Sequence, residues 1–236
     1  MIAIYVPTPY RKLAGGAASL VGQGRTVREL LEDLTARYPD LAAQIWANGE
    51  VRHYINVYVN GEEIRELQGL ETPLHDGDTV AFVPALVGGT TEPAAPETPF
   101  AEGRIVIPLA HYQEMVRHAE EEYPNECCGL LAGRDATVER VYRMRNIRQS
   151  PVMYTMDPKE QLRVFEEIDQ AGQTLVGIYH SHTHSPAYPS PTDIRLAFYP
   201  DSAYVIISLA DRSRPDVRAF QIVDGTVREL EVVVLR

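Results

Sequence analysis

TLVGIYHSHTHSPAYPSPTD, residues 174–193, joins an apolar segment to three histidines at alternate positions, His180, His182 and His184. The apolar run before the histidines predicts a buried β-strand. Side chains on a strand alternate between its two faces, so His180 and His182 project to the same side if the strand continues through them. Two imidazole rings at positions i and i+2 then converge on one metal ion.

A zinc ion in a catalytic site usually takes three protein ligands and one water, so the histidine pair needs a third protein ligand. None of the seven histidines of the chain lies beyond His184. That count disfavours metallo-β-lactamase-type hydrolases and amidohydrolase barrels, which need further histidines downstream. Asp193 is the natural third ligand, at the first turn of the short helix predicted for residues 191–200. His184 adds a third imidazole, which either competes as a ligand or lines the substrate groove.

The remainder of residues 104–236 is predicted to alternate between strands and helices. Strands are expected at 104–108, after the ECCGLLAG segment, at 137–147, at 203–210 and in a hairpin around Asp224-Gly225, and helices at 109–124 and 157–172. His111 and His118 lie seven residues apart on the first of these helices and are predicted to face solvent. Cys127 and Cys128 precede an apolar strand and are predicted to be small buried residues rather than nucleophiles or ligands.

The spacing His-Ser-His, ten residues, then Asp193, with Ser190 three residues before the aspartate, resembles the JAMM (MPN+) metalloprotease signature. The segment PNECCGLLAG, residues 124–133, resembles the part of that family that carries a catalytic glutamate. Thr183 departs from the family, which usually has proline after the second histidine. The resemblance covers nearly all of residues 104–236. It implies a zinc-dependent peptidase or isopeptidase with a cytidine-deaminase-like α/β fold.

The same resemblance implies a role for each residue of the signature. His180, His182 and Asp193 would hold Zn²⁺ and leave a fourth position open. Such an ion lowers the pKa of its bound water from about 15.7 toward roughly 7 and polarises the scissile carbonyl. Glu126 would take the proton of the water and deliver it to the leaving amine. Ser190 would donate a hydrogen bond to the developing oxyanion.

Glutamates close to Glu126 offer an alternative base. Glu121 and Glu122 lie at the charged end of the predicted helix, where a solvated face is the simpler interpretation. Glu122 is the next candidate if Glu126 does not act as the base.

The N-terminal part of the chain predicts a second, smaller α+β unit. IAIYV, residues 2–6, alternates like a strand, and TVRELLEDLTARYP, residues 26–39, has helical spacing with Thr26 as cap and Glu29 as capping-box partner. Residues 55–64 predict a strand, an Asn60-Gly61 turn and a second strand, and residues 74–89 close the unit with a last strand. This order suggests a sheet with one helix packed on a face.

This segment resembles the β-grasp sulfur carriers of the MoaD/ThiS type, which are relatives of ubiquitin. The matching residues are Asn60-Gly61-Glu62, the LHDGDTV segment at 74–80 and the PALVGG segment at 84–89. In that family the C-terminal diglycine is adenylated and carries a thiocarboxylate. Here Gly88-Gly89 continues into Thr90, so the pair is a candidate site of self-cleavage or, once freed, of activation.

TTEPAAPETPFAEG, residues 90–103, contains three prolines and three acidic residues and predicts an extended linker. The sequence therefore predicts a ubiquitin-like β-grasp domain at 1–89, a Pro-rich linker at 90–103 and a JAMM domain at 104–236.

Composition narrows the partners of this 236-residue chain. A net charge of −11 disfavours nucleic acid, which is bound by basic surfaces. No apolar run approaches the roughly 18 residues of a membrane span, and the N-terminus has no signal-type apolar core. The two cysteines are adjacent and poorly placed for a disulfide. These features predict a soluble, cytoplasmic protein.

Three functional hypotheses follow. In the first, the zinc peptidase cleaves the amide after a diglycine in its own chain or a neighbouring copy, at Gly89-Thr90. In the second, it acts on separate ubiquitin-like sulfur carriers, releasing an attached amino acid such as cysteine or deconjugating a modified protein. In the third, the chain is a non-enzymatic carrier or docking module for a ubiquitin-activating-type adenylating enzyme.

Overall fold

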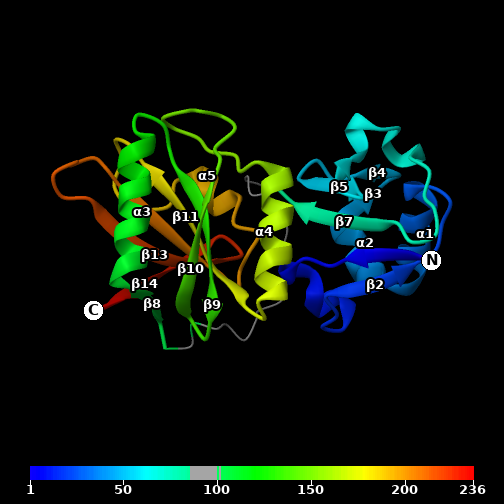
Figure 1. Cartoon of the computed structure of the whole chain (residues 1–236), viewed down its shortest axis with the longest axis horizontal. Coiled ribbons are helices and arrows are strands. Elements are labelled where there is room, and N and C mark those ends of the chain that lie inside the picture. Colours follow the sequence, from blue (N-terminus) through cyan, green and yellow to red (C-terminus); the bar gives the residue numbers. More distant parts are fainter. Residues whose placement is uncertain (86–99, 101) are drawn as a thin grey trace. The chain divides into compact units, whose positions relative to one another are not determined.

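The computed structural model describes residues 1–85, 100 and 102–236, and the chain divides into two compact units after Ala85. Figure 1 shows the helices and strands of both units. Gly88, Gly89 and most of the predicted linker lie outside the described residues.

The N-terminal unit is built on a five-stranded sheet with the order β2-β1-β7-β5-β6. The central pair, β1 and β7, is parallel, whereas the other neighbours are antiparallel. The strands are β1 (Ile2–Tyr5), β2 (Ser19–Gly22), β5 (Ile55–Val59), β6 (Glu62–Glu63) and β7 (Thr79–Pro84), and a separate two-stranded sheet pairs β3 (Trp46–Ala47) with β4 (Glu50–Val51). The expectation of a β-grasp-like sheet unit is confirmed.

Helix α1 (Val27–Arg37) begins where its sequence predicts. The Thr26 hydroxyl accepts a hydrogen bond from the Glu29 amide, and the Glu29 carboxylate accepts one from the Arg25 amide at 2.7 Å, one residue before the cap. The apolar stripe of α1 is fully buried and comprises Val27, Leu30, Leu31 and Leu34.

Local features of this unit escaped the sequence prediction. Strand β2 was not predicted, because four residues give little alternation to detect. Helix α2 (Pro39–Ile45) begins at the proline that was placed at the end of α1, a position that suits the fixed φ of proline. Short 3-10 turns cover Thr8–Ala14, Ile64–Glu66 and Gly69–Glu71.

Seven strands of the C-terminal unit close into a barrel with the order β10-β8-β14-β13-β12-β11-β9. They are β8 (Arg104–Pro108), β9 (Cys128–Arg134), β10 (Thr137–Met144), β11 (Thr174–His182), β12 (Ala203–Ser208), β13 (Asp216–Val223) and β14 (Thr226–Leu235). In β11, all eight residues from Leu175 to His182 are buried. All predicted strands of this unit form.

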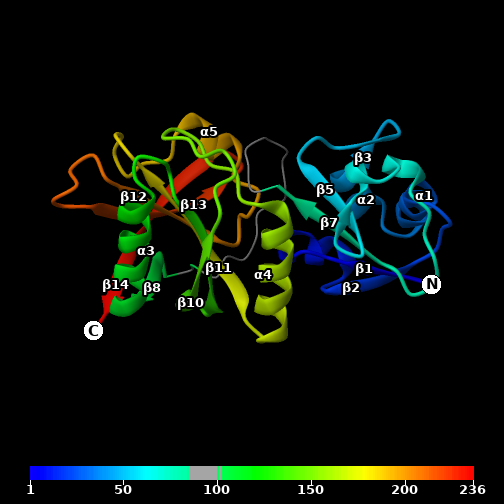
Figure 2. The ribbon, with the colours of Figure 1, turned by 45° about the horizontal axis from the view of Figure 1, so that its top comes forward.

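Helices α3 (Leu109–Glu122) and α4 (Pro158–Gln170) lie on opposite sides of these strands (Figures 1 and 2). Met115 and Ala119 of α3 join the main core with Ile105, Val205 and Leu131. The short helix α5 (Pro191–Arg195) follows β11 after a loop. It lies at the same end of the unit as the loop that leads from β10 to α4 (Figure 2).

The predicted solvent exposure of His118 is wrong. His118 is buried at 5% exposure, and its Nδ1 lies 2.8 Å from the Tyr179 hydroxyl. Burial lowers the pKa of His118 to about 4, so the ring is neutral near pH 7. The helix turns its Met115, His118 and Ala119 face inward. His111 is half-buried, with Nε2 3.0 Å from the Glu139 carbonyl oxygen.

Candidate metal centre

Strand β11 carries His180 and His182 into the interior on one face. The strand pairs with β12 in parallel and with β9 in antiparallel register, which places His180 beside Cys128 and Ile206. Both histidines are buried, at 1% and 5% exposure, and their Nε2 atoms lie 3.0 Å apart. The strand persists through both residues, so the period of two brings the rings together.

Asp193 reaches the histidines from the first turn of α5. Ser190 caps this helix: its hydroxyl accepts from the Asp193 amide at 3.1 Å, and the Asp193 carboxylate accepts from the Ser190 amide at 2.7 Å. This reciprocal pair fixes the carboxylate. One oxygen of Asp193 lies 3.5 Å from His180 Nε2 and the other 3.5 Å from His182 Nε2.

The three side chains form a cluster that could hold a metal ion, with their ligand atoms within 4.8 Å of one another. Burial raises the pKa of Asp193, but His180 and the hydrogen bonds of the site outweigh it, so the pKa is lowered. The carboxylate therefore stays ionised beside two imidazoles. Two nitrogen donors and one carboxylate are the ligand types that zinc takes in catalytic sites.

The two histidines are oriented by different means. His182 Nδ1 lies 2.9 Å from the Pro186 carbonyl oxygen, which only a protonated Nδ1 can donate to, so Nε2 keeps its lone pair for a metal. His180 Nδ1 is buried and has no hydrogen-bond partner among the described residues. Instead, the Tyr154 ring stacks on His180 with centroids 4.8 Å apart and an interplanar angle of 29°.

Glu126 is held beside the cluster by its backbone. Its amide donates to the Ser150 carbonyl oxygen at 2.9 Å, and its own carbonyl oxygen accepts from the Asn146 amide group at 2.9 Å. The backbone amide of the next residue, Cys127, donates to the Ser181 hydroxyl at 2.8 Å. This bond ties the segment to β11 at the residue between the two histidines. Burial raises the pKa of Glu126, and its carboxyl interacts electrostatically with all three cluster residues.

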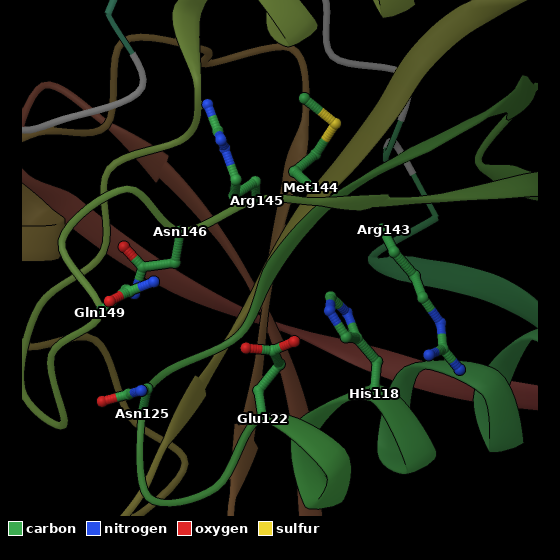
Figure 3. A pocket seen from close by; sticks show the side chains of 8 residues that line it. All are labelled: His118, Glu122, Asn125, Arg143, Met144, Arg145, Asn146 and Gln149. Atoms are coloured by element: carbon green, nitrogen blue, oxygen red, sulfur yellow. The ribbon is translucent and has the colours of Figure 1, made fainter.

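The alternative residues are less suited to chemistry at the cluster. Glu122 is exposed and lines a separate cavity of about 420 Å³ together with His118, Asn125, Arg143, Met144, Arg145, Asn146 and Gln149 (Figure 3). Its carboxylate points into that cavity, which none of the three cluster residues lines. Cys127 is buried as expected, and burial raises its pKa to about 12, so a thiolate does not form near neutral pH.

His184 does not join the cluster. The Thr183 hydroxyl donates to the Pro151 carbonyl oxygen at 2.8 Å and lies 2.7 Å from His184 Nδ1. A hydroxyl has one proton, so the hydroxyl accepts from a protonated Nδ1 of His184. The ring of this exposed histidine packs instead near Tyr123, with centroids 6.1 Å apart.

The loop between β10 and α4, residues 145–157, contributes more to the site than its sequence suggested. It supplies Tyr154, Asn146 and the carbonyl groups of Ser150 and Pro151. Asn146 Oδ1 also accepts from the amides of Arg148 and Thr155, which fixes the loop from within. No residue of this loop stands in a recognisable motif, and its role follows only from tertiary contacts.

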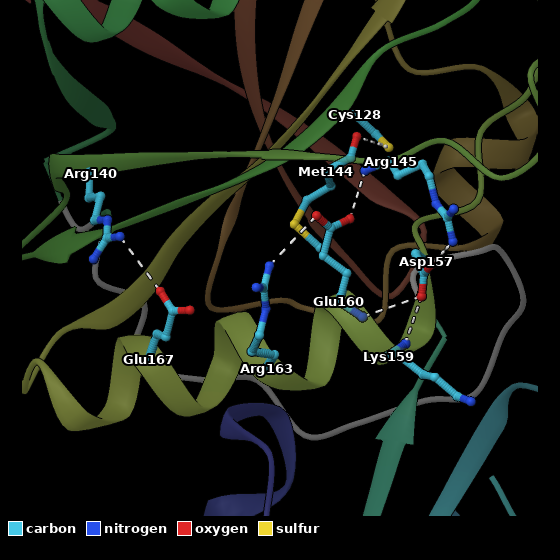
Figure 4. Close-up of polar contacts among 9 residues, drawn as sticks. All are labelled: Cys128, Arg140, Met144, Arg145, Asp157, Lys159, Glu160, Arg163 and Glu167. Atoms are coloured by element: carbon cyan, nitrogen blue, oxygen red, sulfur yellow. Dashed lines mark hydrogen bonds and ion pairs between the residues drawn. The ribbon is translucent and has the colours of Figure 1, made fainter. Parts of the chain in front are cut away.

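The far end of this loop is anchored to α4 (Figure 4). Asp157 caps the helix by accepting from the amides of Lys159 and Glu160, and it forms an ion pair with Arg145. The Glu160 carboxylate accepts from the Arg145 amide at 2.8 Å. These contacts tie the start of the loop to its end, so Tyr154 is presented to His180 from a closed loop.

A barrel that positions two histidines, a helix-capping aspartate and a buried glutamate defines a JAB-type peptidase unit. The family of prokaryotic homologs of the JAB domain matches residues 108–223, and the ThiS family matches residues 4–89. The chain belongs to the prokaryotic JAB family and carries a ThiS-like sulfur carrier domain ahead of its JAB domain.

Separate relatives resemble the two units. The CysO-cysteine peptidase of Mycobacterium tuberculosis is 45% identical over 133 residues, which cover 56% of this chain and 91% of that protein. The desampylase of Haloferax volcanii is 39% identical over 129 residues, covering 51% and 88%. The sulfur carrier protein CysO of Mycobacterium tuberculosis is 33% identical over 91 residues, covering 37% and 98%. Among the described residues, no helix is both long and apolar enough to span a membrane.

Proposed function

We propose that the chain is a zinc-dependent peptidase that hydrolyses the amide bond after the diglycine of a ubiquitin-like sulfur carrier and releases an attached amino acid such as cysteine. The observation that carries this proposal is the buried His180, His182 and Asp193 cluster with Glu126 beside it. Zinc bound there would acidify a water molecule and polarise the scissile carbonyl.

The residues of the chain would then divide the work. Glu126, whose raised pKa suits a group that must both accept and return a proton, would move the proton from water to the leaving amine. Ser190 accepts from Asp193 through its oxygen, and its own O–H remains a donor for the oxyanion.

Fusion of the two units supports the choice of substrate. Relatives of the JAB unit include a CysO-cysteine peptidase, and a relative of the N-terminal unit is CysO itself. One polypeptide thus resembles both a peptidase and the carrier named as its substrate. We propose domain boundaries at 1–89, 90–103 and 104–236, which give the carrier domain a diglycine end. The desampylase relative supports deconjugation of a carrier from a modified protein as the alternative reaction.

Glu126→Gln tests this function. The variant keeps the size of the side chain but cannot accept the proton of water. We expect it to retain zinc. It should cleave a ThiS-type carrier ending in diglycine-cysteine at least about a hundredfold more slowly than wild type. The control is Glu122→Gln, which should cleave at the wild-type rate. Mass spectrometry measures the released carrier and elemental analysis the zinc. Near-normal turnover by Glu126→Gln would move the base elsewhere, and absence of cleavage by the wild type would favour a non-enzymatic docking module.

A second candidate function is cleavage of its own Gly89-Thr90 bond. The ThiS match ends at residue 89, although the chain continues. Only a freed diglycine has the carboxylate that an adenylating enzyme needs, so cleavage would turn the N-terminal unit into a carrier for such a partner. Incubated wild-type protein should then yield a fragment ending at Gly89, in the same chain or by the action of a neighbouring copy, and Glu126→Gln should not. A wild-type chain that stays intact with added zinc while it cleaves a separate carrier rules out self-processing.

A further inference from the structure

Three residues, Arg212, Tyr123 and His184, form a group that we call the Tyr123 stack, beyond the end of β11 where Leu209 of the β12–β13 connection donates its amide to the His182 carbonyl oxygen. The Arg212 guanidinium lies over the Tyr123 ring, 4.3 Å from its centroid, and the His184 ring centroid lies 6.1 Å from that of Tyr123 at an interplanar angle of 49°. The three residues come from the β12–β13 loop, the end of α3 and the loop after β11. Arg212 and His184 are exposed and Tyr123 is half-buried. The stack therefore presents a cation to solvent on an aromatic base.

Chain connectivity links this stack to the two segments that carry Glu126 and His182. Tyr123 lies three residues before Glu126, on the same segment, and His184 lies two residues after His182. His184 is held there because its Nδ1 donates to the Thr183 hydroxyl, which is itself bound to Pro151. Under the proposed function, Glu126 passes a proton to the leaving amine. The stack shares a chain segment with Glu126 and is therefore the candidate contact for the leaving group.

The guanidinium of Arg212 has no acidic partner in the part of the chain that the structure describes. The hydrogen bonds within the loop that carries Arg212 do not involve its guanidinium. The Asp211 carboxylate accepts from the amide and hydroxyl of Ser213, and the Asp211 carbonyl oxygen accepts from the Arg214 amide. A free cation is notable in a chain with a net charge of −11. Guanidinium groups bind carboxylates with two parallel hydrogen bonds.

We propose that Arg212, supported by Tyr123 and His184, binds the α-carboxylate of an amino-acid leaving group. This inference rests on the proposed function. In an amino acid joined to a diglycine, the carboxylate carbon is two bonds from the scissile nitrogen, about 2.5 Å away. A receptor for it must therefore stand close to Glu126, and Tyr123 lies on the same segment, three residues away. A lysine side chain in an isopeptide has no carboxylate at that position, so the stack selects single amino acids over protein conjugates.

The test uses the full-length zinc-loaded protein and a separate ThiS-type carrier ending in diglycine-alanine. Alanine replaces cysteine so that no thiol binds the metal. The substrate is prepared with a free C-terminal carboxylate and as the C-terminal amide. We expect wild type to prefer the acid by about tenfold in kcat/KM, mainly through KM, because hydrogen bonds to charged groups are stronger than those to neutral ones. Arg212→Gln should lose this preference by cleaving the acid more slowly and the amide at the wild-type rate.

Two variants separate recognition from other effects. Arg214→Gln removes an exposed arginine of the same loop and should keep the preference. Arg212→Lys, which retains the charge, should restore part of it. Equal cleavage of acid and amide by wild type overturns the carboxylate site while the proposed function stands. An equal loss on both substrates in Arg212→Gln also overturns it, since a structural role affects both. If wild type cleaves neither substrate, the proposed function fails and the inference with it.

Discussion

Strand β11 and the loop that follows it carry the same pattern of alternate histidines to different ends. In the strand, residues 174–182, pairing with β9 and β12 holds the period of two, and His180 and His182 face each other. In the loop, the backbone leaves the sheet, and His184 turns toward Tyr123. Spacing in the sequence predicts a common face only as far as the hydrogen-bonded strand continues.

The comparison also separates two ways of orienting a ring inside the strand. His182, at the strand end, uses the loop, because its Nδ1 donates to Pro186. His180, one pleat deeper, is out of reach of that loop and packs against Tyr154.

Removing a strand histidine should abolish zinc binding, whereas removing the loop histidine should not. His182→Ala leaves one nitrogen and one carboxylate, too few for a tetrahedral site with three protein ligands. Asp193→Ala should have the same result. Elemental analysis of the purified proteins should give about one zinc per wild-type chain, nearly none in these two variants and a full equivalent in His184→Ala. Loss of zinc in His184→Ala, or its retention in both others, would show that the ligands are assigned wrongly.

Tyr154 should matter for zinc affinity through its ring rather than its hydroxyl. Tyr154→Ala removes the stack that orients His180, and we expect zinc affinity to fall about 10- to 100-fold, the usual effect of losing a residue that orients a ligand. Tyr154→Phe keeps the stack and should bind nearly as tightly as wild type. Competition with a chromophoric chelator measures both. Equal losses in the two variants would assign the effect to the hydroxyl, and no loss in either would leave His180 oriented by its backbone alone.

Patterns within the sequence predicted most of the scaffold. The apolar run before His180, the cap at Thr26 and the Asn60-Gly61 turn each depend on neighbouring residues, and each formed as expected. The candidate ligand cluster could equally be predicted from the sequence, because β-strand geometry and a capping Ser190-Asp193 pair are local properties.

Residues that act across the fold were not predictable in this way. Tyr154 lies 26 residues before His180 in a loop without periodicity, and its stack depends on how Asn146 and Asp157 close that loop. The prediction for His118 was wrong because apolar spacing in the sequence does not fix which side of a helix meets the core. The sequence also does not show that Tyr179 is the buried partner of this ring. Gly88 and Gly89 remain predictions, since they lie outside the described residues.

Acidification should weaken zinc binding through His182, and this gives the smallest of the three effects at mildly acidic pH. Burial lowers the pKa of His182, but its hydrogen bonds to Asp193 and Pro186 outweigh burial and raise it above the ordinary value of 6.5. The metal must displace this proton, so affinity is full above the raised pKa and falls below it by about tenfold for each pH unit. Asp193 adds nothing in this range, because its lowered pKa keeps it ionised.

Chelator competition between pH 8 and about 5.5 measures the slope. His184→Ala should give the same profile as wild type if the loop histidine stands outside the site. A profile shifted by that substitution would mean that strand and loop histidines share the proton, and the contrast between them would no longer hold.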